Sequence, residues 1–296
     1  MTTSATTVLP GPRRRRPRQR ALGDPLRLVV TSRGDRVAIY VLLGFMAILF
    51  AFPLYAAVDK SLEVGGWRNY VSLLTDPIGS VPIWQTYLNS LAIGVLHAVL
   101  VLVVATTAGY AFSRLRFRGR EVGFSLVLLF LAVPGAAIIV PVYRITQELG
   151  LFNNYLGVAL PEAALTIPFG VLLLRNHGRN MPGSLFEAAA IDGASHWRVF
   201  RSIFLPMARP ALVNLTVLCF VWSLQDFLWP SFVFTDPSMA SAAQAVQTFS
   251  SALGQGPADI AKYNASLVLL GLPAVAFVLF GLRFIVDGLT SGAVKE

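Results

Sequence analysis

Three charged residues lie inside or at the end of long apolar segments, where charge is costly. Arg144 ends one such segment, Glu162 lies within the next, and Asp226 lies within a third. Charged side chains at membrane depth usually pair with one another or line a polar pathway. A helical rise of 1.5 Å per residue puts Asp226 roughly 24 Å above the start of its segment, near the external surface. We predict that the three residues share an external polar layer, either as an ion pair that orients helices or as the lining of an entrance.

The sequence offers no set of side chains that suggests catalysis or metal binding. The three histidines, His97, His177 and His196, are scattered along the chain. The phosphate-binding pattern G-x-x-x-x-G-K-[ST] is absent. An intramembrane enzyme would need paired aspartates or a nucleophile with its base, whereas the polar residues here are single and separated. We therefore predict a chain with no catalytic residue, no metal site and no cofactor of its own.

The composition is that of a membrane protein. Of 296 residues, 55% are apolar and 13% are charged, about half the charged fraction of a soluble domain, which is near 25%. The mean hydropathy is +0.65. An apolar helix of about 20 residues spans a bilayer. The six predicted transmembrane helices are residues 37–58, 88–112, 122–143, 156–174, 210–234 and 265–282.

The distribution of basic residues predicts the orientation of these helices. Twenty of the 24 Lys and Arg residues fall in the N-terminal tail, the loops 113–120 and 175–209, and the C-terminus. Basic residues accumulate in cytoplasmic loops, so both termini are expected in the cytoplasm. The net charge of +9 is then explained by topology, and we predict no nucleic-acid partner. Residues 1–35 contain the run Arg13–Arg16 and several prolines, which predicts a disordered cytoplasmic tail beside anionic membrane lipid.

The segment 175–209 is too polar for a transmembrane helix and too apolar for a solvated loop. Ser184 and Glu187 have the spacing of a capping box, which predicts a short helix that Gly193 ends or bends. A second helical stretch over 197–205 places Trp197, Phe200 and Phe204 near one face. Two short helices across the membrane surface would form a knob, whose alanines allow close approach to a partner.

The spacing of particular residues in this segment resembles the EAA signature of ABC-importer membrane subunits. The matching residues, at every spacing, are Glu187, Ala188, Ala189, Gly193, Ile203, Leu205 and Pro206. Further segments are similar to the carbohydrate-uptake branch of that family, namely Asn89-Ser90-Leu91, 109–119, 149–154, 191–195 and 292–295. The closest likeness is to the maltose-type and trehalose-type second permease subunit, and it covers roughly residues 36–296. Residues 222–227 and 176–178 depart from the usual pattern.

The resemblance implies a fold, a role and partners. The fold class would be an all-α polytopic membrane protein, a six-helix type I ABC importer-like domain over 36–296 with a cytoplasmic coupling-helix loop at about 177–209. The coupling helix, with Glu187, Ala188, Ala189, Asp192 and Gly193, would dock on a separate ATPase that binds the ATP. The partners implied are a second homologous permease subunit, two copies of the ATPase and an extracytoplasmic solute-binding protein. The location implied is a bacterial or archaeal inner membrane.

Other transport functions remain open at this stage. Permeases for amino acids, polyamines or peptides share the docking loop, so only the flanking segments favour a sugar. A secondary transporter driven by an ion gradient would be expected to have broken, repeated helices at the midplane, and the sequence gives no indication of them. The sequence does not identify the sugar.

Overall fold

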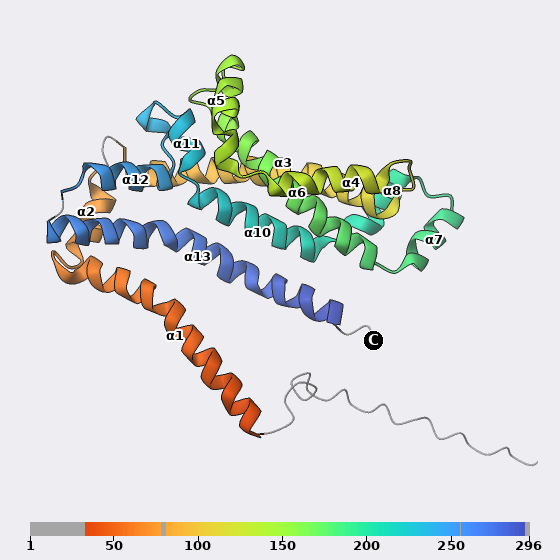
Figure 1. Ribbon diagram of the computed structural model, residues 1–296, viewed down its shortest axis with the longest axis horizontal. Coiled ribbons are helices and arrows are strands. Elements are labelled where there is room, and N and C mark those ends of the chain that lie inside the picture. Colours follow the sequence, from red (N-terminus) through yellow and green to blue (C-terminus); the bar gives the residue numbers. More distant parts are fainter. Residues whose placement is uncertain (1–32, 78–80, 255, 294–296) are drawn as a thin grey trace, which may run out of the picture. The chain divides into compact units, whose positions relative to one another are not determined.

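The computed structural model describes residues 33–77, 81–254 and 256–293, and side chains up to residue 281. The predicted disordered tail, residues 1–35, lies almost entirely outside the described residues. The chain divides into two units at Pro53. Helix α1 (Arg33–Glu63) runs through this division, and its first part is the described portion of the N-terminal unit. The described residues confirm an all-helical membrane protein (Figure 1).

The larger unit, from Leu54 onward, contains the other helical elements. In chain order these are α2 (Arg68–Thr75), α3 (Ile83–Arg114), α4 (Arg120–Leu129), η2 (Phe130–Ala132), η3 (Gly135–Ile138), α5 (Ile139–Glu148), α6 (Tyr155–Asn180), α7 (Gly183–Ile191), α8 (His196–Val199), η4 (Phe200–Phe204), α9 (Leu205–Met207), α10 (Arg209–Gln225), α11 (Leu228–Val233), η5 (Pro237–Met239), α12 (Ala242–Ala252) and α13 (Pro257–Ala293).

The predicted transmembrane helices are present, but the third is bent, and a second bend lies just before the fifth. Among the described residues, α1, α3, α6 and α13 are long and apolar enough to cross a membrane without interruption. Two helix pairs pass the same test only together, and they bend by 92° between 132 and 135 and by 72° between 207 and 209. Counting each bent pair as one span gives the six predicted. The third prediction, a single helix over 122–143, is therefore wrong in detail.

The break in the third span follows from its sequence. Pro134 lacks an amide hydrogen and restricts the residue before it to extended conformations. Val133 accordingly has φ −79° and ψ 114°, and it ends the turn that follows α4. After the break, η3 and α5 restart the helix in a new direction.

The fifth prediction, a helix over 210–234, also needs correction. Helix α10 ends at Gln225, and Asp226 adopts an extended conformation with φ −75° and ψ 121°. Its Oδ1 accepts a hydrogen bond from the Leu228 amide at 2.8 Å. Asp226 is therefore a capping residue between α10 and α11, not a charge in mid-helix.

The packing centre of the larger unit is the pair α3 and α6, with α10 against α3 and α13 against α10. The largest apolar cluster joins Val101 and Ala105 of α3, Leu174 of α6, Phe204 and Leu215. Figure 1 shows α7 and α8 at one end of this bundle, and α2 and α12 at the other. The segments that follow the first and fifth predicted spans, 59–86 and 235–264, contain the short helices α2, η5 and α12.

Candidate functional site

The residues between α6 and α7 end the first helix and start the second. Met181 ends α6 in an extended conformation, Pro182 follows, and α7 runs from Gly183 to Ile191. The predicted capping box does not form, because the helix begins one residue before Ser184 and has no side-chain cap. The predicted end does form: Gly193 has φ +69°, a conformation that glycine adopts without steric cost. The glycine thus sets the angle between α7 and α8.

One face of α7 is free of contacts with the rest of the unit. Glu187, Ala188 and Asp192 are exposed, and Ile191 is 87% exposed. Ala189 points the other way and is only 8% exposed. It holds α7 against the bundle together with Phe186, whose ring lies 3.9 Å from the Arg114 guanidinium carbon. The exposed face therefore combines the carboxylates of Glu187 and Asp192 with small residues and the large apolar side chain of Ile191.

An aromatic column fixes the segment after Gly193. Trp197 stacks on Phe200 with ring centroids 5.5 Å apart, and Phe200 stacks on Phe204 at 6.0 Å. Both phenylalanines also contact Tyr110 of α3, each at 5.2 Å. The predicted common face of Trp197, Phe200 and Phe204 is confirmed. The column anchors the exposed helix to the end of α3.

The remaining residues of the signature lie behind α7. Ile203 and Leu205 are half-buried and pack against the main apolar cluster, whereas Pro206 is exposed. Residues 200–204 form a π-helical turn, η4, which is the local irregularity between α8 and α9. These three residues therefore belong to the connection between α7 and the bundle, and not to the exposed face of α7.

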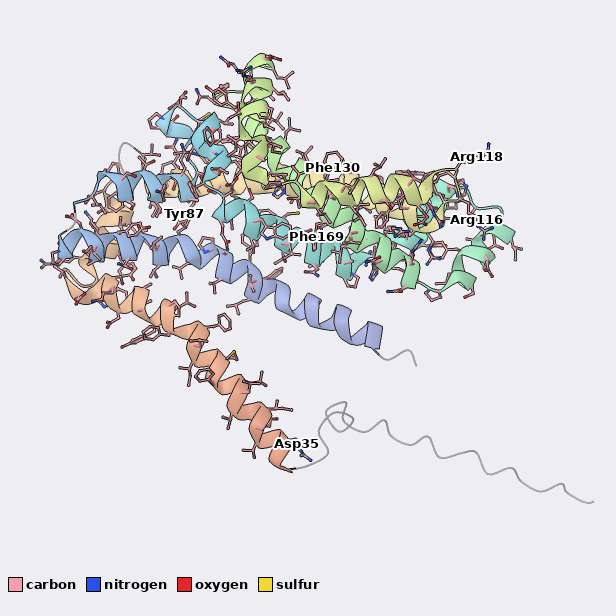
Figure 2. The ribbon with its side chains drawn as sticks, in the orientation of Figure 1. Asp35, Tyr87, Arg116, Arg118, Phe130 and Phe169 are labelled. Carbon is pink, nitrogen blue, oxygen red and sulfur yellow. The ribbon has the colours of Figure 1, made fainter. Side chains whose placement is uncertain are left out.

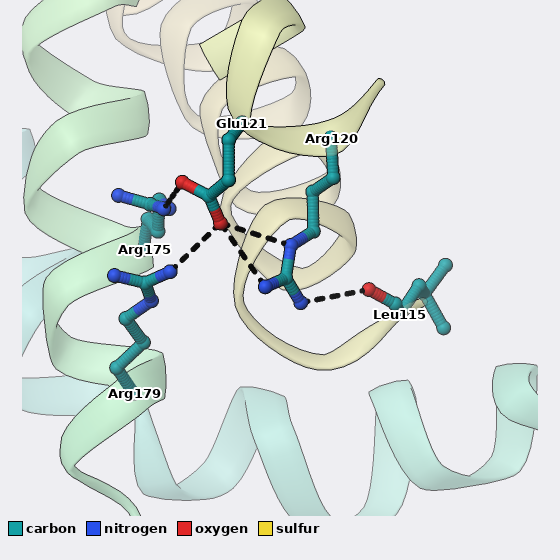
Figure 3. A network of polar contacts seen from close by, with 5 residues as sticks. All are labelled: Leu115, Arg120, Glu121, Arg175 and Arg179. Carbon is teal, nitrogen blue, oxygen red and sulfur yellow. Dashed lines mark hydrogen bonds and ion pairs between the residues drawn. The ribbon is translucent and has the colours of Figure 1, made fainter. Parts of the chain in front are cut away.

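A carboxylate at the start of α4 binds three arginines (Figure 3). Glu121 accepts from Arg175 at 2.5 Å, and from Arg179 and Arg120 at 3.0 Å each. Arg175 is 6% exposed at its side chain, and its guanidinium lies 3.6 Å from the Phe124 ring centroid. Arg114 donates to the carbonyls of Gly178 and Met181, the latter at 2.7 Å. The ends of α3, α4 and α6 are thereby joined next to α7. The distribution of basic residues in the sequence predicted that these arginines lie in cytoplasmic loops, but it did not predict that Glu121 binds three of them.

The structure brings together two of the three predicted intramembrane charges. Glu162 is 6% exposed and lies within electrostatic reach of Asp226 and Ser223. Both carboxylate oxygens of Glu162 and Oδ2 of Asp226 are buried with no hydrogen-bond partner in the described part of the chain. Arg144 is exposed on α5, and no ion pair joins it to either carboxylate among the described residues.

His97 is the partner of Glu162 that sequence reasoning missed. Its Nδ1 lies 3.4 Å from Glu162 Oε2, and its Nε2 lies 3.1 Å from the Thr166 hydroxyl. The Thr166 hydroxyl donates to the Glu162 carbonyl, so Nε2 supplies the hydrogen of its own bond. The contact between His97 Nδ1 and Glu162 Oε2 is then favourable only if one of these two atoms carries a proton. The position of His97 in mid-span was the available indication, since polar groups there bond across helices.

Two asparagines organise the opposite end of the bundle. The side-chain oxygen of Asn153, Oδ1, accepts hydrogen bonds from the backbone amides of Thr235 and Asp236, at 2.8 and 2.9 Å. Asn89 donates to the carbonyls of Ser238 and Ala240, each at 2.9 Å. The amide of Ser238 donates to Asp236 at 2.9 Å, and this hydrogen bond lowers the pKa of Asp236. The segment 234–240 is therefore tied by side chains to α3 and to the loop that precedes α6.

Comparison with known families identifies this architecture. Residues 102–291 match the model described as "Binding-protein-dependent transport system inner membrane component". The osmoprotective compounds uptake permease protein GgtD of Synechocystis sp. is 35% identical over 77% of this chain and 76% of its own length. The trehalose transport system permease protein SugB of Mycobacterium tuberculosis is 32% identical over 70% and 76%. The arabinooligosaccharides transport system permease protein AraQ of Halalkalibacterium halodurans is 30% identical over 85% and 94%.

Solved structures agree on the fold. A chain of a bacterial ABC transporter involved in the import of the acidic polysaccharide alginate superposes with a TM-score of 0.69 at 23% identity, covering 85% of this chain and 97% of that one. A chain of the MetNI methionine ABC transporter gives 0.55 at 18% identity, covering 69% and 93%. The predicted type I importer fold is confirmed.

Proposed function

This chain belongs to the family of binding-protein-dependent transport system inner membrane components, and we propose that it serves the ATP-driven import of a sugar or oligosaccharide. As a member of that family it is a multi-pass inner-membrane permease subunit. The sugar assignment is supported by relatives whose names refer to trehalose and arabinooligosaccharides. They are at least 30% identical over most of this chain.

The observation that carries the proposal is the exposed face of α7. Glu187, Ala188 and Ile191 are held away from the bundle, while Ala189, Phe186 and the aromatic column fix the helix from behind. A short helix that is rigidly supported and has one contact-free face is suited to transmit movement from a partner. We infer that α7 is the coupling helix and that it docks on a separate ABC ATPase, which binds the ATP. This chain then supplies no catalytic residue and no cofactor site.

The proposed assembly contains a second, homologous permease subunit, two ATPase copies and an extracytoplasmic solute-binding protein. A solved neighbour is an alginate transporter in complex with an alginate pentasaccharide-bound periplasmic protein, which supports such partners in general. In this proposal the two permease subunits each form half of the translocation pathway. The α7 end of the bundle faces the cytoplasm, together with both termini, as the arginines of 114–120 and 175–209 indicate.

We also propose that Glu162 and Asp226 belong to the solute pathway. Glu162 Oε1 and Asp226 Oδ2 are buried without a hydrogen-bond partner in the described part of the chain, and such oxygens are acceptors suited to the hydroxyl groups of a sugar. Arg144 remains part of the proposal as an exposed residue of α5 on the external side, where it would contribute to the entrance.

The decisive experiment tests the α7 interface. The tagged chain is purified from its host with Glu187→Lys as the variant and Glu148→Lys, the same charge change on exposed α5, as the matched control. We expect the wild type and the control to recover an ATPase whose activity rises with loaded solute-binding protein. Because charge reversal in an interface centre costs about 2 kcal/mol or more, Glu187→Lys should lower that recovery at least about tenfold. Equal recovery from both variants would contradict the assignment of α7.

A further inference from the structure

A pocket with a volume of about 510 Å³ opens between the end of α3 and the start of α4. It is lined by Arg116, Phe117, Gly119, Arg120, Glu121 and Val122. Arg116 and the adjacent Arg118 are exposed, and neither guanidinium has a carboxylate partner in the described part of the chain. Figure 2 shows both at the end of the bundle where α7 and α8 lie.

The nearby carboxylate does not neutralise these two arginines. Both oxygens of Glu121 are taken by Arg120, Arg175 and Arg179. Arg120 is further held by the carbonyl of Leu115 at 3.2 Å. The pocket therefore keeps the guanidinium of Arg116, which has no carboxylate partner among the described residues, and Arg118 lies two residues further along the chain, outside the residues that line the pocket. Guanidinium donors suit the oxygens of a phosphate group.

An apolar stripe continues from the pocket along α4. Val122, Leu126 and Leu129 are 65%, 54% and 64% exposed, and Phe130 in η2 is 64% exposed. Spacings of four and three residues place Val122, Leu126 and Leu129 on one side of α4, and Phe130 continues the exposed apolar surface in η2. The other side of α4 is packed, since Phe124 is 6% exposed. A free basic pocket thus passes directly into a free apolar face about two turns long.

We propose that the pocket and stripe form a binding site for one anionic phospholipid of the cytoplasmic leaflet. The headgroup phosphate contacts Arg116 and Arg118, and an acyl chain follows the stripe of α4. A lipid with a negative headgroup is favoured over a zwitterionic one because the only carboxylate among the described residues that line this pocket, Glu121, is already paired with arginines, and basic pockets at cytoplasmic helix ends select anionic lipids. The inference rests on the proposed orientation of the chain.

The site adjoins the docking helix. Arg116 and Arg120 also line a second pocket, of about 560 Å³, whose opposite wall includes Phe186, Glu187 and Ala190 of α7. A headgroup in the first pocket therefore lies beside the support of α7. We infer that the lipid stabilises the arrangement in which α7 is held for docking.

Lipid retention tests the proposal directly. The full chain, purified with its copurifying partners, is exchanged into detergent with phosphatidylglycerol or phosphatidylcholine, and bound lipid is measured by native mass spectrometry. We expect selective retention of phosphatidylglycerol, and an affinity roughly 30-fold lower in Arg116→Ala/Arg118→Ala, from a contribution near tenfold or less per arginine. Arg198→Ala/Arg201→Ala removes two exposed arginines of the α8 to η4 segment and should retain the lipid. Arg116→Lys/Arg118→Lys should retain most of it.

Several outcomes would overturn the site. Equal phosphatidylglycerol retention by the alanine double variant excludes these arginines. Displacement of the lipid by millimolar inorganic phosphate identifies a free phosphate site instead. If the alanine double variant loses a copurifying second permease subunit while its lipid retention is unchanged, this surface is a subunit interface instead. Orientation is checked separately in a Cys219→Ser background: Ser195→Cys should react with an impermeant maleimide only from the cytoplasmic side. External labelling would overturn orientation and lipid site together, whereas ATPase recovery tests the proposed function alone.

Discussion

The interface between α3 and α6 and the proposed docking helix α7 both depend on glycines, but for opposite reasons. In the interface, a Cβ at Gly170 would lie 2.8 Å from the Ala105 Cβ, and one at Gly109 would lie 2.6 Å from the Leu174 Cβ. At Gly193, after α7, a Cβ would meet nothing within 4 Å, and the requirement is the positive φ. Small residues let membrane helices approach closely. The bundle therefore needs glycine for space, whereas α7 needs it for direction, and the two regions should respond differently to substitution.

The largest expected effect comes from filling the helix interface. Gly170→Leu forces α3 and α6 apart, and overpacking of this kind costs about 3 kcal/mol or more. We expect loss of monodisperse protein in fluorescence-detected size-exclusion chromatography, with a much lower unfolding temperature. Gly271→Leu in α13 is the control, because a Cβ at Gly271 meets nothing within 4 Å. A folded, thermally unchanged Gly170→Leu protein would refute the close approach of α3 and α6.

The second effect tests whether Gly193 is needed for its positive φ and not for close packing. Gly193→Val places a β-branched residue at φ +69°, which costs about 2 kcal/mol locally. We expect α7 to be misdirected, so that ATPase recovery falls about tenfold while the bundle remains folded. Gly193→Asn is the matched control, since asparagine tolerates the left-handed region. If the Gly193→Val and Gly193→Asn proteins copurify with equal amounts of ATPase, the backbone angle at residue 193 does not matter for docking.

The third effect concerns the arginine network that joins the two regions. Glu121→Gln keeps the shape of the side chain but leaves the buried Arg175 without its counter-ion. Because Glu121 is 57% exposed, solvent replaces part of the interaction, and we expect only a small decrease in the unfolding temperature. Thermal unfolding in detergent measures it. Glu148→Gln, on exposed α5, should have no measurable effect, and a similar loss in both variants would deny the network a specific role.

The smallest effect is inside the bundle. Thr166→Val preserves the shape of the side chain and removes the hydroxyl that His97 contacts. Side-chain hydrogen bonds between membrane helices contribute about 0.6 kcal/mol on average, so we expect a small decrease in thermal stability. Thr216→Val removes a hydroxyl that bonds only within its own helix, to the Leu212 carbonyl. The Thr166 variant should lose more stability than the Thr216 variant, and the reverse order would argue against the contact with His97.

The sequence allowed prediction of whatever depends on local pattern. Apolar runs located six spans, and the EAA spacing located α7 and the glycine that follows it. The aromatic spacing of Trp197, Phe200 and Phe204 also predicted their shared face correctly. These features depend on residues near one another in the chain, where helical periodicity determines which side chains meet.

The remaining features depend on contacts between distant segments or on competition between local rules. The pairing of His97 with Glu162 and the convergence of Arg175 and Arg179 on Glu121 join different helices, which no spacing reveals. The extended conformation at Asp226 overrides an apolar run that continues beyond it. At Pro134 the proline rule was available, but the length of the apolar run around it favoured one straight helix.

The π-helical turn over Phe200–Phe204 has a consequence for insertions and deletions in this segment. Such a turn accommodates one residue more than an α-helical turn of the same height. Deleting the exposed Ser202 would let the turn close in α-helical form, and each residue in an α-helix accounts for about 100° of rotation. Because the π-turn already absorbs its extra residue within its own height, the segment before the deletion would keep its direction, whereas the same deletion in a regular α-helix would rotate that segment by this amount. Residues 200–204 can therefore lose one residue while the Glu187 face of α7 keeps its direction, and the proposed docking contact should survive that deletion.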